Sequence, residues 1–109
     1  MPFVTTGEML KKAQAGGYAI GAFNAENLEM AQAIVAAAEA ENAPVIIQTT
    51  PGTLKYAGPK CFAGVVSRLA RDAKVPVALH LDQGRERIQE GAGRKACHVY
   101  DPYALLAYK

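Results

Sequence analysis

Three short apolar runs, separated by segments with helical periodicity, limit the possible folds of this chain more than any other feature. The runs are Tyr18–Phe23, Val45–Ile47 and Val77–Leu81, and each is bounded at one end or both by glycine, proline, asparagine or aspartate. Near-continuously apolar strands that alternate with helices are typical of a parallel sheet covered on both faces. The sequence therefore predicts an α/β fold in which a leading helix precedes a strand–helix–strand–helix–strand order.

Local signals place the helices around these strands. Thr5 and Glu8 match a capping box, and the two glycines at 16 and 17 are suited to end that first helix. A second helix begins within 24–27, a third follows Gly58, and residues 49–52 are predicted to form a polar loop. The positions expected to form the buried stripes are Leu28, Ala31, Ile34, Val35 and Ala38 in the second helix and Phe62, Val65, Val66, Leu69 and Ala73 in the third.

Composition excludes several classes of protein. The 109 residues are 50% apolar with a formal net charge of +2 and no basic run, so neither nucleic acid nor an anionic membrane is an expected partner. No apolar run approaches the roughly 18 residues of a membrane-spanning helix, and no signal-peptide pattern opens the chain. Cys61 and Cys97 form no CxxC motif and no ligand cluster with His80 and His98. A reducing cytoplasm is therefore the expected location.

Polar side chains follow each of the three predicted strands. They are Asn24 after the first, Thr49 and Thr50 after the second, and Asp82 with Gln83 after the third. Because the C-terminal ends of parallel strands gather ligand-binding groups, these residues are candidates for one site. Each also has a structural alternative, since asparagine and aspartate cap helices and threonines satisfy turns. A carboxylate directly after an apolar strand is well placed for proton transfer.

Other residues carry weaker signals. The glycines at 16, 17 and 21 lie before and within the first strand, whereas a dinucleotide fingerprint needs them in the turn after it. His80 lies inside the third strand, where a hydrogen-bonded structural histidine is preferred to a ligand. Cys61 is expected to fill space in or near the core.

Six motifs follow one another in register along the first 84 residues. They are Thr5–Leu10, Gly16–Asn24, Asn27–Glu29, Ala43–Ile47, Thr50–Thr53 and Val75–Asp82. Together they resemble the start of the class II, zinc-dependent ketose-bisphosphate aldolase family, which includes fructose-1,6-bisphosphate and tagatose-1,6-bisphosphate aldolases. The 50–53 motif favours the tagatose branch.

The resemblance implies a fold and a reaction. The fold would be a TIM (β/α)8 barrel, of which this chain would hold the first three βα units, because a closed barrel takes roughly 250 residues. The reaction would be reversible aldol cleavage of a ketose 1,6-bisphosphate to dihydroxyacetone phosphate and glyceraldehyde 3-phosphate, a step of glycolysis and related carbohydrate metabolism. Zinc would act as the Lewis acid, and the full-length enzyme would be a homo-oligomer.

The resemblance also implies roles for single residues. Asp82 would be catalytic and exchange the proton of the C4 hydroxyl, while Asn24 and Thr50 would contact the sugar bisphosphate. Gln83 stands where the family has a histidine that binds zinc. An amide oxygen binds zinc less well than an imidazole nitrogen, so the metal site is expected to be lost and zinc is a doubtful cofactor for this chain.

The resemblance divides the chain into residues 1–84, the aldolase-like portion, and residues 85–109, a tail that does not match. The loss of register suggests a frameshift or truncation just past Asp82, and the chain is predicted to be an inactive fragment. Two alternatives remain: a non-catalytic remnant or interaction module that docks on a partner, and a small open-sheet α/β protein with its own ligand. Because the third strand would have an unpaired edge, an expanded, aggregating or oligomeric state is expected.

Overall fold

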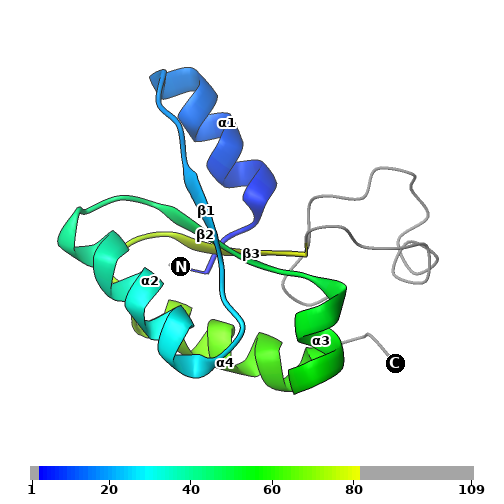
Figure 1. Cartoon of the computed structure of the whole chain (residues 1–109). Helices are drawn as coiled ribbons and strands as arrows, with labels where there is room; N and C mark the ends of the chain where they lie inside the picture. The colour runs from blue at the N-terminus through cyan, green and yellow to red at the C-terminus, as the bar shows by residue number, and fades with distance from the viewer. Residues whose placement is uncertain (1–2, 82–109) are drawn as a thin grey trace, which may run out of the picture.

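The computed structural model describes residues 3–81, which form a three-stranded parallel sheet and four helices (Figure 1). The strands lie in the order β1-β2-β3, so neighbours in sequence are neighbours in the sheet. In chain order the elements are α1 (Thr6–Gly16), β1 (Gly21–Asn24), α2 (Leu28–Ala40), β2 (Val45–Thr49), α3 (Pro51–Ala57), α4 (Pro59–Asp72) and β3 (Val77–Leu81). The predicted alternation of strands and helices is confirmed, with α3 as an addition.

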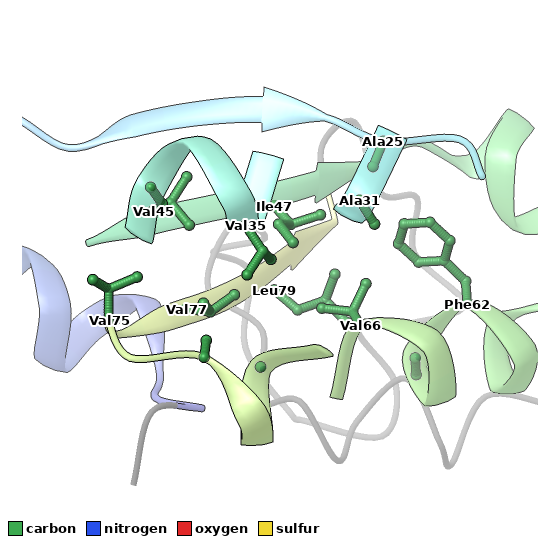
Figure 2. Packing of buried hydrophobic residues seen from close by; sticks show 14 of the residues in the cluster. Ala25, Ala31, Val35, Val45, Ile47, Phe62, Val66, Val75, Val77 and Leu79 are labelled. Atoms are coloured by element: carbon green, nitrogen blue, oxygen red, sulfur yellow. The ribbon is translucent and has the colours of Figure 1, made fainter. Parts of the chain in front are cut away.

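The main core lies between the sheet and the pair of helices α2 and α4, which lie side by side on one face (Figures 1 and 2). Ile47 and Leu79 point from the sheet toward this layer, where Val66 and Phe62 of α4 meet them, and all four are at most 2% exposed. Helix α2 contributes the buried Ala31, Val35 and Ala38 to the same cluster. Small alanine side chains allow this helix to approach the sheet closely.

Helix α1 covers the other face of the sheet near its N-terminal end. Because strand side chains alternate between faces, Ile46 and Ala78 point away from α2 and α4, and Met9 of α1 packs on both. The Thr5 hydroxyl accepts from the Glu8 amide at 3.3 Å. This bond is the threonine half of the predicted capping box. The helix ends at Gly16 and is capped by Gly17, whose φ of 69° suits a residue without a β-carbon.

The first described residues lie against the last strand. Phe3 forms a parallel bridge with Val77, and the Val4 amide donates to the Val77 carbonyl at 3.0 Å. Strand β2 pairs with Val77 as well, so the Phe3 bridge lies on the opposite edge of β3. The expected unpaired edge of the third strand is therefore occupied at its N-terminal end.

Two of the predicted elements were wrong in detail. The run Tyr18–Phe23 was expected to be a buried strand, but β1 is Gly21–Asn24, all four residues are exposed, and Phe23 keeps 53% of its surface. Within residues 3–81, β1 is an edge strand with a neighbour on one side alone. The predicted polar loop at 49–52 is also wrong, because β2 extends to Thr49 and α3 begins at Pro51. Proline fits a first helical position, which needs no amide donor.

The predicted apolar stripe of the second helix is confirmed in part. Ala31, Val35 and Ala38 are buried, whereas Leu28, at the start of the helix, is 44% exposed. No helix in the described part of the chain is long and apolar enough to cross a membrane. The tail predicted for residues 85–109 lies outside the described residues.

Candidate functional site

A row of three polar residues crosses the sheet near the C-terminal ends of its strands. Asn24 of β1 is the register partner of Gln48 of β2, and Gln48 is the partner of His80 of β3. Ile47 and Leu79 face the helical layer, so alternation directs the row to the opposite face. His80 is 8% exposed, Gln48 is half-buried and Asn24 is exposed. The row therefore runs from a covered strand to an open edge.

The Asn24 side chain is held by β2. Its Oδ1 accepts a hydrogen bond of 2.8 Å from Nε2 of Gln48, and the next backbone amide, of Ala25, donates to the Gln48 carbonyl at 3.0 Å. The alternative in which Asn24 caps the following helix is wrong. That cap is Asn27, whose Oδ1 accepts from the Met30 amide at 2.8 Å. The side-chain amide of Asn24 thus bonds to the neighbouring strand and does not cap α2.

The two threonines at the C-terminal end of β2, Thr49 and Thr50, point in different directions. Thr49 ends the strand and is 1% exposed, so it belongs to the core on the helical side. Thr50 is the N-cap of α3 in an extended conformation, with φ −121° and ψ 165°, and alternation places it on the same side as Gln48. Its hydroxyl makes no cap bond and lies 3.4 Å from the Thr53 hydroxyl. Of the pair, Thr50 is the one that can face a ligand.

Asp82 and Gln83, the predicted catalytic and former metal positions, lie outside the described residues. In sequence they follow Leu81, the last residue of β3. Within residues 3–81, no three His, Cys, Asp or Glu side chains form a group that could hold a metal ion. Cys61 is exposed and not in a disulfide. Of the two expected places for this residue, in the core or near it, the core is therefore wrong.

Gln48 was missed as a site residue by sequence reasoning. The signal was available, because Gln48 is a polar residue directly after the apolar run Val45–Ile47 and lies two positions before Thr50. Residues separated by two share one face of a strand.

An open apolar groove of about 670 Å³ lies between β1 and α2. Phe23 and Tyr18 line it from the edge of the sheet, and Ile34 and Ala37 line it from the helix. Its strand residues Gly21 and Phe23 alternate with Asn24 and so point away from the polar row. The groove is therefore a second surface, separate from the candidate site.

Comparison with known proteins finds a family whose members match most of this chain. The model of the family described as class II fructose-bisphosphate aldolase matches residues 4–98. The fructose-bisphosphate aldolase of Thermus caldophilus is 49% identical over 81 residues, which are 74% of this chain and 26% of that protein. The chain thus spans about a quarter of the length of this curated relative. The family match extends past residue 84, and the division of the chain at that point remains a prediction.

Two solved structures resemble the described fold. The YdjI aldolase from Escherichia coli K12 has a TM-score of 0.72 and 30% identity, over 87% of this chain and 38% of that one. A putative fructose-1,6-biphosphate aldolase from Coccidioides immitis has a TM-score of 0.68 and 34% identity, over 79% of this chain and 33% of that one. The parallel α/β sheet is therefore part of an aldolase TIM barrel, as the resemblance predicted.

Proposed function

Because the chain belongs to the class II fructose-bisphosphate aldolase family, we propose that it supplies the first three strands of an aldolase active site. The proposed reaction is the reversible aldol cleavage of a ketose 1,6-bisphosphate to dihydroxyacetone phosphate and glyceraldehyde 3-phosphate. Its substrate class is a small sugar bisphosphate, with the tagatose compound as the preferred candidate.

The row of Asn24, Gln48 and His80 carries this proposal. It lies near the C-terminal ends of adjacent parallel strands, where barrel enzymes place their catalytic groups. His80, the last member of the row, lies two residues before Asp82 in sequence. Such an arrangement suits a substrate with several oxygen atoms, because amide and imidazole groups offer hydrogen bonds in fixed directions.

In this proposal each polar residue has one role. Asp82 takes the proton of the C4 hydroxyl while the C3–C4 bond breaks, and it returns that proton when the bond forms. Asn24 and Thr50 donate to substrate oxygens and hold the sugar in place. The rate of the chemical step then depends on Asp82, whereas binding depends on the other two.

Zinc needs residues beyond those described. The family implies this metal, but residues 3–81 hold no group of three potential ligands, and glutamine at position 83 is a weak substitute for histidine. The donor set of residues 3–81 does not fit a zinc ion by itself. When bound in the family, zinc supplies Lewis acidity to the substrate carbonyl.

We further propose that the 109-residue chain alone does not turn over substrate, and that a longer family member would assemble as a homo-oligomer. The support is that the described sheet holds three strands, whereas a complete barrel closes with eight. A cytoplasmic location is part of the proposal, since the two cysteines, Cys61 and Cys97, form no CxxC motif and indicate no disulfide framework.

A second candidate is a non-catalytic module that docks on a partner. The exposed apolar groove between β1 and α2 favours it, because contiguous apolar surface marks interaction sites. In this case the polar row would have no ligand, and substitutions of its residues would leave the binding of the partner unchanged.

A chimeric enzyme tests the first proposal. Residues 1–84 would replace the corresponding segment of the Thermus caldophilus relative, in two versions that differ at position 83, and aldol cleavage would be followed with added zinc. We expect turnover in the version with Gln83→His and its loss on Asp82→Ala. Turnover that survives Asp82→Ala but is lost with a chelator would contradict the role given to Asp82. A folded chimera with no turnover would favour the docking module.

A further inference from the structure

The hydrogen bond between Gln48 and Asn24 fixes the direction of an amide. A side-chain amide carries an acceptor oxygen on one side and a donor nitrogen on the other. Here Nε2 of Gln48 donates to Oδ1 of Asn24 at 2.8 Å. Oδ1 of Asn24 therefore faces β2, and Nδ2, the donor atom, faces away from Gln48.

The backbone around Asn24 is fixed by the same residue. The carbonyl oxygen of Gln48 accepts from the amide of Ala25, a residue with no exposed surface. Main-chain pairing thus sets the position of Asn24, and the side-chain bond sets the rotation of its amide. A donor that is held in this way before the ligand arrives needs little reorganisation on binding.

Stability gives no adequate reason for the side-chain bond. Asn24 is exposed, and water competes well with an exposed amide–amide bond, so its net contribution to folding is small. The helix that follows is already capped by Asn27. The remaining effect of the bond is that it fixes the direction in which Nδ2 of Asn24 can donate.

We propose that Gln48 is a positioning residue, which orients the Asn24 amide so that Nδ2 donates to an oxygen atom of the substrate. This inference rests on the proposed function for its ligand, a sugar phosphate, and on the structure for the orientation. Gln48 itself acts through Asn24.

Reversal of the donor on Gln48 tests this role. In Gln48→Glu the carboxylate can only accept, so the Asn24 amide is expected to turn, donate Nδ2 to position 48 and present Oδ1 to the ligand. Gln48→Met removes the bond with nearly the same side-chain length. Gln32→Glu, at an exposed position of α2, controls for the added charge.

The first measurement uses side-chain amide resonances of the ¹⁵N-labelled 109-residue chain, with Asn24→Asp to assign the Asn24 pair. In the unsubstituted chain we expect the Gln48 amide protons to show the hydrogen bond and the Asn24 protons to exchange freely. In Gln48→Glu the Asn24 protons should become the bonded pair. A bonded Asn24 pair in the unsubstituted chain, or no change in Gln48→Glu, would overturn the proposal.

The second measurement is titration with dihydroxyacetone phosphate, read from the same resonances. Gln48→Glu should weaken binding about tenfold, as expected for one hydrogen bond, Gln48→Met should weaken it less, and Gln32→Glu should leave it unchanged. Equal binding by all variants would overturn the positioning role. If the unsubstituted chain does not respond to this probe, the proposed function fails, whereas the orientation is still decided by the first measurement.

Discussion

Asn24 and Asn27 are three residues apart in sequence, and the side-chain oxygen of each accepts one bond of 2.8 Å. The donor to Asn27 is the nearby amide of Met30, which is a local pattern that a sequence reveals. The donor to Asn24 comes from Gln48, on another strand. Both asparagines precede α2, so a helix cap could be predicted in this segment. Which of the two asparagines forms the cap could not be predicted from the sequence. The difference depends on strand register, which is a property of the folded sheet.

At position 83 we expect a single side chain to decide the zinc affinity of the enzyme. In the chimera described above, Gln83→His is expected to raise zinc affinity by more than about tenfold, since imidazole is a better zinc ligand than an amide oxygen and even outer-shell partners change metal affinity 10- to 100-fold. Competition with a chromophoric chelator would measure it. Gln14→His, on the exposed surface of α1, is the matched control, and equal affinity in both versions would contradict the ligand role.

Among the elements, the central strands and long helices could be predicted and the edge elements could not. β2 and β3 follow apolar runs because their side chains are buried within the sheet. β1 also has an apolar sequence, yet it is exposed, because burial depends on neighbours that a local pattern does not include. Helix α3 could not be predicted from the sequence, because Thr50 and Pro51 are typical of loops as well as of helix starts.

The aromatic residues of α3 and α4 give a test of the helical layer. Phe62 is 2% exposed in the main core, whereas Tyr56 is 84% exposed. Phe62→Ala should lower the free energy of unfolding by about 3–5 kcal/mol, and Tyr56→Ala should change it by less than about 0.5 kcal/mol. Urea unfolding followed by far-ultraviolet circular dichroism would compare them. Similar shifts for the two variants would mean that α4 does not pack as described.

At the scale of the whole molecule, the sheet ends in an exposed strand. The resemblance predicted the α/β class and the partial barrel correctly, because several motifs in register specify a fold together. The apolar groove beside β1 could not be predicted, since it depends on the distance between β1 and α2. Uncovered apolar surface of this kind favours association.

We therefore expect the 109-residue chain to self-associate, although the reason is now the exposed edge strand β1 and its groove rather than the edge of the third strand. Phe23→Lys places a charge in the groove and should shift the population toward monomer in sedimentation velocity, because burial of an unpaired charge is costly. Tyr56→Lys, which lies outside the groove residues, should leave the distribution unchanged. A sharp monomer peak for the unsubstituted chain, together with a cooperative thermal transition, would contradict this expectation.

The bridge between Phe3 and Val77 has a consequence for the order of folding. It joins the first described residues to the last described strand, so during synthesis the N-terminal segment leaves the ribosome long before its partner exists. Contacts between distant parts of a chain form slowly. The Val4 amide, which donates to Val77, should therefore become protected from hydrogen exchange among the last amides of the sheet, and α1 should dock only after β3 has joined β2.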